Sequence, residues 1–201
     1  MLIKICGITQ VEETESLNDN QVDFAGVVMF FPRSKRNTSP EQAARIIEAL
    51  DKNIRKVAVV VSPTLPQIRC IENLGFDYLQ IHGKLTEEIL QSVQIPILKA
   101  FNVSDMEEYE FYHHCPQVAG YVFDAQEPGS GKTFDWSLVD RIPRDEKLLI
   151  LAGGLNPDNV DEAIGKVCPD GVDVSSGVEY TDRPGKATNK IDSFVKKVRC
   201  S

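Results

Sequence analysis

The sequence predicts an α/β protein, and within that class a compact (β/α)8 TIM barrel that forms a single domain over residues 1–201. Short apolar runs alternate with helical patterns eight times, and strict alternation of this kind implies a parallel sheet with right-handed crossovers. Eight such units favour a closed barrel over an open, doubly wound sheet. No linker, low-complexity segment or break in composition divides the chain, whose 201 residues suit one short barrel.

Eight apolar runs have the length and composition of buried parallel strands. Val57–Val61 is the clearest, because a continuous run of mostly valine is expected of a strand that is covered on both faces. Pro96 stands near the start of another run, where its missing N–H does least harm. The expected strands are Leu2–Cys6, Phe24–Phe31, Val57–Val61, Tyr78–Ile81, Ile95–Ala100, Val118–Phe123, Leu148–Leu151 and Gly171–Val174.

Helical patterns follow the strands, with apolar residues recurring at intervals of three or four. Ser39-Pro40-Glu41 gives one clear helix start, because it combines a capping residue, a first-turn proline and an early acidic residue. Asn156-Pro157 predicts another start for the same reasons. The expected helices cover 11–17, 40–50, 63–74, 85–93, 104–112, 134–139, 157–167 and 189–198.

Composition and charge restrict the classes of partner. A net charge of −8 and a pI of about 5.0 argue against non-specific binding to nucleic acid or to an anionic membrane, but allow an anionic small molecule. No apolar run approaches the roughly 20 residues of a membrane span. Five scattered cysteines without a CxxC motif, and a first strand without a secretory pattern before it, predict reduced thiols and a cytoplasmic protein. With three histidines and no clustered carboxylates, we expect no metal site.

The last two strands each end in small residues. The seventh is followed by Gly153-Gly154 and the eighth by Ser175-Ser176. Strands that end in such residues expose backbone N–H groups, and in (β/α)8 barrels a phosphate site characteristically lies after strands seven and eight. The sequence therefore predicts a phosphate cup, although the glycines alone would also suit tight strand-to-helix turns.

Two side chains at strand ends are candidates for proton transfer. Cys6 ends the first strand and Asp124 follows the sixth, so both should lie at the face where active sites of such barrels occur. Cys6 as a thiolate would accept a proton, and Asp124 with a raised pKa would donate one. The alternatives are a small buried hydrophobic residue for Cys6 and a loop-capping carboxylate for Asp124.

Further polar residues are expected around the same mouth. Arg36, in the basic loop after the second strand, offers a two-point contact to a carboxylate or phosphate, unless the loop is simply solvated. Gln80 and His82 share one face of the fourth strand, where His82 is either a substrate contact or a satisfied barrel histidine. Gly131 lies in a GSGK run that lacks the spacing of a nucleotide-binding P-loop and suits a lid over the anion site.

Six blocks in order carry a resemblance that spans almost the whole chain. They are KICGIT at 4–9, FFPRSKRNTSP within 30–40, QIHG at 80–83, FDA with GSGKTFDW at 123–136, LAGGLNPDNV at 151–160 and GVDVSSGVE at 171–179. Together they resemble the phosphoribosylanthranilate isomerase family of tryptophan biosynthesis. The resemblance implies a (β/α)8 barrel that uses no cofactor, acts on a small phosphorylated substrate, and works as a monomer or a homodimer.

The resemblance also implies an activity and residue roles. The activity is the Amadori rearrangement of N-(5'-phosphoribosyl)anthranilate to 1-(o-carboxyphenylamino)-1-deoxyribulose 5-phosphate. Cys6 would be the general base and Asp124 the general acid, with Arg36 on the substrate carboxylate. The phosphate would be held by residues of three loops: Gly131, Gly153, Gly154, Ser175 and Ser176. The loop after Asp124 is short, which would affect lid motion.

Two alternatives differ from this interpretation. The related sugar isomerase of histidine biosynthesis uses two aspartates and a substrate with two phosphates, whereas the first strand here ends in Cys6 and the opposite half-barrel has no second glycine pair. A non-catalytic sugar-phosphate-binding barrel would keep the cup and tolerate loss of the acid and base. The presence of both Cys6 and Asp124 argues against it.

Overall fold

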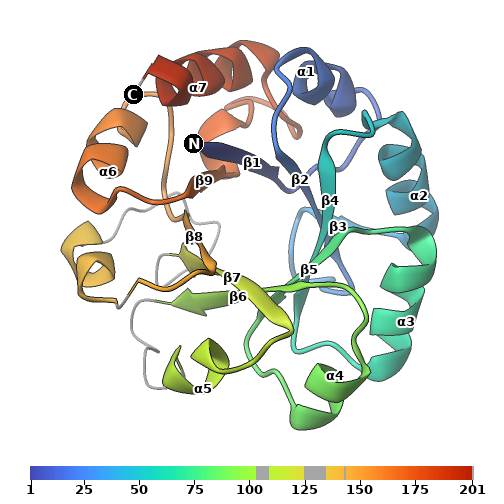
Figure 1. Ribbon diagram of the computed structural model, residues 1–201. Helices are drawn as coiled ribbons and strands as arrows, with labels where there is room; N and C mark the ends of the chain where they lie inside the picture. Colours follow the sequence, from blue (N-terminus) through green and yellow to red (C-terminus); the bar gives the residue numbers. More distant parts are fainter. Residues whose placement is uncertain (103–108, 125–134, 143, 201) are drawn as a thin grey trace.

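The computed structural model describes residues 1–102, 109–124, 135–142 and 144–200 as a closed parallel barrel. In this part of the chain eight strands form the ring, each pairing in parallel with its neighbours, and β1 closes it by pairing with both β9 and β2. Figure 1 shows the strands gathered at the centre with helices around them. The ring consists of β1 (Leu2–Cys6), β2 (Phe24–Met29), β4 (Arg55–Val61), β5 (Tyr78–His82), β6 (Ile97–Asn102), β7 (Val118–Asp124), β8 (Leu148–Leu151) and β9 (Gly171–Val174).

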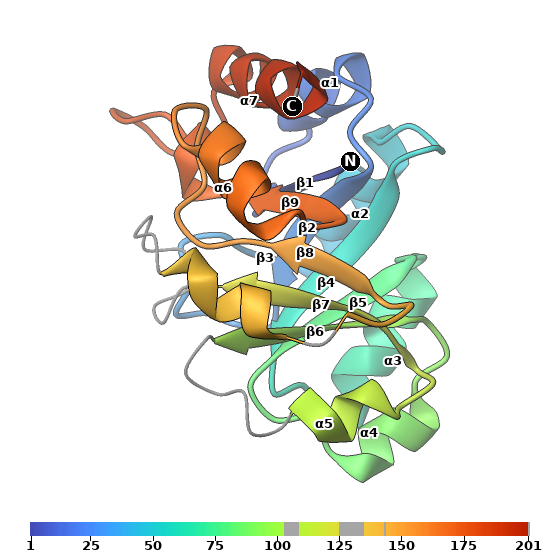
Figure 2. The same cartoon turned by 60° about the vertical axis from the view of Figure 1, so that its left-hand side comes forward.

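Helices connect the strands on the outside of the barrel. Helices α1 and α7, which are far apart in the sequence, lie side by side there (Figures 1 and 2). Helices α2, α3, α6 and α7 bury apolar residues that recur at intervals of three or four, as the 3.6-residue period requires. The helical elements are α1 (Glu13–Asp19), α2 (Pro40–Ala49), α3 (Leu65–Leu74), α4 (Glu87–Ser92), α5 (Tyr109–His113), η2 (Trp136–Arg141), α6 (Val160–Val167), η3 (Ser176–Val178) and α7 (Thr188–Cys200).

Alternation along the strands divides the apolar residues into two layers. Outward-facing residues pack under the helices, and the inward-facing residues fill the barrel as a separate cluster. That inner cluster consists of Cys6, Phe24, Val57, Val59, Leu98, Ala100, Val122, Ile150 and Ala152. The barrel is therefore a packed core with chemistry confined to the strand ends.

The predicted barrel class is confirmed, and all eight strand predictions correspond to strands of the ring within a few residues. The differences have local causes. Helix α6 begins at Val160 rather than at Pro157, because the Asn156 side chain accepts a hydrogen bond from the Asp158 N–H at 2.8 Å and forms a turn first. The segment 136–141 is a 3₁₀ helix, since a run this short gains little from α-helical hydrogen bonds.

One further strand was not predicted. The two-residue β3 (Asn37–Thr38) pairs with the end of β2 and lies outside the ring. Its neighbour Ser39 accepts a hydrogen bond from the Gln42 N–H and begins α2, as its position before Pro40 predicts. This pairing fixes the loop after β2 and with it Arg36, which immediately precedes β3.

Candidate active site

A cavity of about 1170 Å³ opens at the carboxyl ends of the strands. Because all eight ring strands are parallel, residues that end different strands meet at this one rim. Nine of the sequence-predicted site residues line the cavity: Cys6, Arg36, Gln80, His82, Asp124, Gly153, Gly154, Ser175 and Ser176. The tenth, Gly131, lies outside the described residues.

Cys6 stands beside a buried ion pair inside the barrel. The Lys4 ammonium, which is 1% exposed, donates to the Asp173 carboxylate at 2.6 Å. Burial raises the pKa of the Cys6 thiol, and the Asp173 charge adds to this, whereas the positive charges of Lys4 and Lys186 oppose it. The net effect is a raised pKa, so a thiolate at this position would be a strong base.

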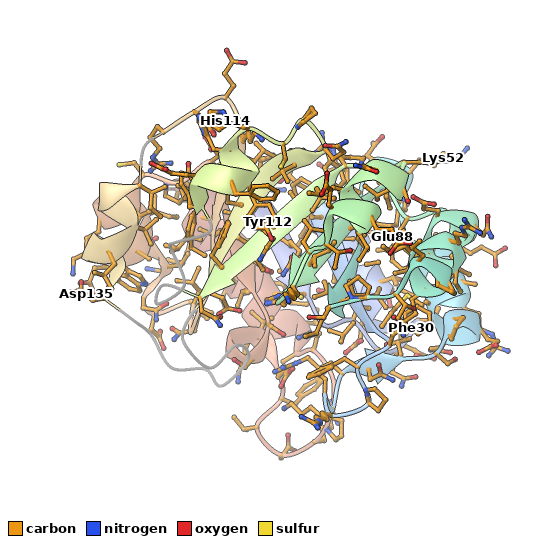
Figure 3. All side chains as sticks on the ribbon, turned by 90° about the horizontal axis from the view of Figure 1, so that it is seen from below. Phe30, Lys52, Glu88, Tyr112, His114 and Asp135 are labelled. Atoms are coloured by element: carbon orange, nitrogen blue, oxygen red, sulfur yellow. The ribbon has the colours of Figure 1, made fainter. Side chains whose placement is uncertain are left out.

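His82 is held neutral at the cavity wall. Burial and the positive charges of Lys4 and Lys99 lower the pKa of His82 to about 3. Its Nε2 lies 2.8 Å from Nε2 of Gln80, and if the amide nitrogen donates, the ring proton is on Nδ1. The other two histidines do not line the cavity, and His114 is exposed on the outside of the molecule (Figure 3). His82 therefore presents a neutral hydrogen-bonding group, not a charge.

Asp124 is the last residue of β7 and lines the cavity half-buried. Strands β9 and β8 separate β7 from β1, so Asp124 and Cys6 belong to well-separated parts of the same rim. Asn102 is in register with Asp124 at the end of β6 and lines the cavity with it. A carboxyl group and a thiol thus lie on different walls of one cavity, an arrangement that allows acid–base chemistry on a molecule bound between them.

The residues predicted to form a phosphate cup lie in the turns after β8 and β9. Gly153 and Gly154 have φ of +83° and +67°, a region that favours glycine. The short helix η3 follows β9, and a Cβ at Gly177 would lie only 2.0 Å from the Leu155 carbonyl oxygen. The two turns are therefore in direct backbone contact, and the glycine at 177 permits it. Backbone N–H groups in such turns are suited to binding a phosphate.

Ser175 has a structural role within this cup. Its hydroxyl donates to the Cys6 carbonyl at 2.9 Å and so joins the end of β9 to the end of β1. Lys186, which is 5% exposed, donates to the Ser175 carbonyl at 3.1 Å and to its hydroxyl at 3.2 Å. Because the Ser175 hydroxyl proton already binds the Cys6 carbonyl, the donor that Ser175 can offer to an anion is its backbone N–H.

Arg36 reaches across the rim to a carboxylate from the other end of the sequence. Its Nε donates to Glu179 at 2.5 Å, and its Nη2 is buried with no hydrogen-bond partner among the described residues. Burial alone would raise the pKa of Glu179, but hydrogen bonds from Arg36 and Lys35 and the charge of Lys186 lower it to about 2. The carboxylate is thus ionised at any physiological pH.

Several charged residues of this site were not predicted from the sequence, among them Lys4, Asp173, Glu179 and Lys186. Two of them carried a signal, because Lys4 and Asp173 are charges within apolar strands, two residues before Cys6 and Ser175. A charge at a position that must face the barrel interior is expected to have a buried partner. Which charge pairs with which depends on the ring order, because these partners are distant in sequence.

A family model described as N-(5'phosphoribosyl)anthranilate (PRA) isomerase matches residues 3–197. The chain belongs to this isomerase family. A family member from Geotalea uraniireducens is 40% identical over 209 residues, covering 98% of each chain. One from Streptococcus gordonii is 38% identical and covers 98% of this chain and 97% of its own.

Solved structures of the isomerase family have the same fold. Phosphoribosyl anthranilate isomerase from Thermus thermophilus aligns with a TM-score of 0.87 at 28% identity, covering 100% of this chain and 99% of its own. The protein from Thermotoga maritima aligns at 0.84 with 34% identity and complete coverage of both chains. The family resemblance seen in the sequence is therefore confirmed, and it extends over the whole barrel.

The described residues offer neither a metal site nor a membrane-spanning helix. No group of three or more His, Cys, Asp or Glu side chains there is arranged as a metal ion would require. In the same ranges, no helix has the length and apolar character needed to cross a membrane.

Proposed function

We propose that Asp124 and Cys6 are the acid and base by which this member of the isomerase family converts N-(5'-phosphoribosyl)anthranilate to 1-(o-carboxyphenylamino)-1-deoxyribulose 5-phosphate. The observation that carries the proposal is that both side chains line one cavity. Strands β8 and β9, whose turns we assign to the phosphate, separate β7 from β1. A sugar phosphate anchored in the cup would lie between the two side chains.

The chemistry proceeds in balanced proton transfers. Protonated Asp124 gives its proton to the furanose ring oxygen, the C1'–O bond breaks, and the ring opens to a Schiff base. The Cys6 thiolate then removes the C2' proton, and the electron pair forms an enolamine. Tautomerisation adds a proton at C1' and removes the proton of the C2' hydroxyl, which gives the ketose. Cys6 then gives its proton to solvent and Asp124 takes one up, so atoms and charge are conserved without a redox partner. General acid and base catalysis of this kind accounts for large rate factors.

The remaining site residues bind the two anionic groups of the substrate. We assign the phosphate to Gly153, Gly154, Ser175 and Ser176, and expect Gly131 to join them. A solved relative, 33% identical with a TM-score of 0.82, is described in complex with reduced 1-(o-carboxyphenylamino)-1-deoxyribulose 5-phosphate. That compound carries both a phosphate and a carboxylate, which supports separate sites for the two groups.

The carboxylate of the anthranilate ring is assigned to Arg36, which lines the cavity. We assign Gln80 and neutral His82 to hydrogen bonds with the opened sugar chain. A neutral imidazole there avoids competing with Asp124 as an acid, because its pKa of about 3 leaves it without a proton to give at neutral pH. No cofactor takes part in the proposed steps.

Turnover of freshly prepared phosphoribosylanthranilate, followed by loss of its anthranilate-type fluorescence, tests these roles. The wild type should convert the substrate, and Cys6→Ser and Asp124→Asn should each lose at least about 100-fold in rate. Cys70→Ser is the matched control, because Cys70 is a half-buried thiol of α3, away from the cavity. Wild-type inactivity would refute the proposed activity, and activity in either variant would refute the role of that residue.

The setting of the enzyme is also proposed. We place it in the cytoplasm as a monomer or a homodimer, on the basis of its biosynthetic family and its relatives. A relative from Thermotoga maritima, 34% identical, is described as dimeric, with monomers generated from it. Light scattering of the purified chain at several concentrations will decide between the two states.

A further inference from the structure

The Arg36 side chain is held by a single carboxylate that also binds two lysines. Glu179 Oε1 accepts from Arg36 Nε at 2.5 Å and from Lys186 Nζ at 3.3 Å, and Oε2 accepts from Lys35 Nζ at 2.7 Å. The Arg36 and Glu179 side chains are each 12% exposed. One negative charge thus faces three positive charges at the cavity rim.

Arg36 is fixed from a second side by backbone. Gly7 has φ of +79°, and a Cβ there would lie 2.4 Å from the Arg36 Cδ, so the arginine stem packs directly on the glycine. With the stem held on Gly7 and Nε held by Glu179, the plane of the guanidinium has little freedom. A pre-oriented donor pair loses less conformational entropy when it binds a carboxylate.

The pairing at Glu179 also leaves part of the guanidinium unused. Arginine can bind a carboxylate by two parallel hydrogen bonds, from Nε and Nη2 or from its two Nη atoms. Glu179 takes only Nε, because its second oxygen is bound to Lys35, and Nη2 has no partner within the described ranges. A buried donor without a partner is costly, and an incoming carboxylate would satisfy it.

We infer that Glu179 is a positioning residue that sets the specificity of the site for a substrate carrying a carboxylate, by orienting Arg36 while Lys35 prevents a closed, two-point Arg36–Glu179 pair. The inference rests on the proposed function of Arg36. Lys186 extends the same arrangement to the phosphate cup, because its ammonium contacts both Glu179 and Ser175. Glu179 therefore links the two anion sites.

The test compares two substrates in the full-length protein. Glu179→Gln keeps the size of the side chain and removes its charge, and should raise KM for phosphoribosylanthranilate by about 10-fold or more with a smaller change in kcat. For phosphoribosylaniline, which lacks the carboxylate, KM should be nearly unchanged. Glu162→Gln is the matched control, because Glu162 pairs with Lys166 on the exposed face of α6. An equal rise in KM for both substrates in Glu179→Gln would overturn the inference.

A second variant keeps the test decisive if Glu179→Gln folds poorly. Lys35 is 72% exposed, so Lys35→Met should fold, and it frees Oε2 of Glu179 for Nη2 of Arg36. In Lys35→Met, the KM for the substrate with the carboxylate should rise. Lys84→Met, which removes another lysine that lines the cavity, should change the KM values of both substrates by the same factor. An unchanged KM ratio in Lys35→Met would overturn the inference.

Failure of the proposed function gives a different pattern. If Arg36 does not bind the carboxylate, Arg36→Met will not discriminate between the two substrates, although the wild type turns over the first. If Arg36→Met changes the KM ratio of the two substrates but neither Glu179→Gln nor Lys35→Met does, the role of Arg36 stands and the positioning role of Glu179 is refuted. In the double variant Arg36→Met with Glu179→Gln, the second substitution should add little further loss.

Discussion

Replacing Lys4 by Met is expected to shift the pH dependence of the enzyme to higher pH. Cys6 is proposed to act as a thiolate, and the charged groups around it are Lys4, Asp173 and Lys186. The Lys4 ammonium lowers the pKa of the Cys6 thiol against the larger effect of burial. Met is similar in length and carries no charge, so it removes this stabilisation with little change in volume.

The strength of the interaction between Lys4 and Cys6 can be worked out from the position of Gly26, which contacts both side chains. A Cβ at this glycine would lie 2.9 Å from the Cys6 Sγ and 3.2 Å from the Lys4 Nζ, so the two atoms are at most about 6 Å apart. At an effective dielectric constant of about 20, unit charges at that distance interact by about 3 kcal/mol, which is roughly a 100-fold change in an equilibrium. Removing the positive charge raises the pKa of Cys6, and the thiolate fraction at neutral pH should fall by about 100-fold.

The assay is kcat/KM as a function of pH, with the rate of Cys6 alkylation by iodoacetamide measured by mass spectrometry as an independent probe of the thiolate. Both should fall at neutral pH in Lys4→Met and recover at alkaline pH. Adding Asp173→Asn removes an opposing charge and avoids a buried unpaired carboxylate, so the double variant should lose less. Equal loss at every pH, or unchanged alkylation, would refute the reasoning, and a thermal melt checks the fold.

Three further results are expected. Ring NMR signals of His82 should show a neutral imidazole down to about pH 4, because its pKa is about 3, and protonation near neutral pH would contradict the site electrostatics. Gly177→Ala should raise KM by about 10-fold or lower the melting temperature, because the new Cβ meets the Leu155 carbonyl at 2.0 Å, whereas Gly165→Ala, with open space around it, should do neither. In acid unfolding, the free energies of unfolding of wild type and Glu179→Gln should differ above the ordinary carboxyl pKa of 4.5 and converge as the pH falls to about 2. The reason is that Glu179, whose pKa is lowered, adds stability only while it is ionised. A constant difference in free energy at every pH would contradict this.

The sequence by itself determined the fold class and most of the rim. Eight apolar runs with helical patterns between them specify parallel strands, and parallel strands bring all their carboxyl ends to one face. Residues that end a strand, such as Cys6, Asp124 and Ser175, could therefore be placed in one cavity without knowledge of any distance. The exact ends of the helices could not be predicted as well. Helix α6 begins three residues later than expected, because the Asn156 side chain first forms a turn.

Only the tertiary structure decided which charges meet. Lys4 and Asp173 are 169 residues apart and Arg36 and Glu179 are 143 apart, so no local pattern pairs them. Ring closure puts β1 next to β9, and this contact gives Lys4 its partner Asp173. Spacing along the chain shows which residues a strand presents, but the energy of a charge depends on its distance from other charges and on burial, which exist only once the barrel closes.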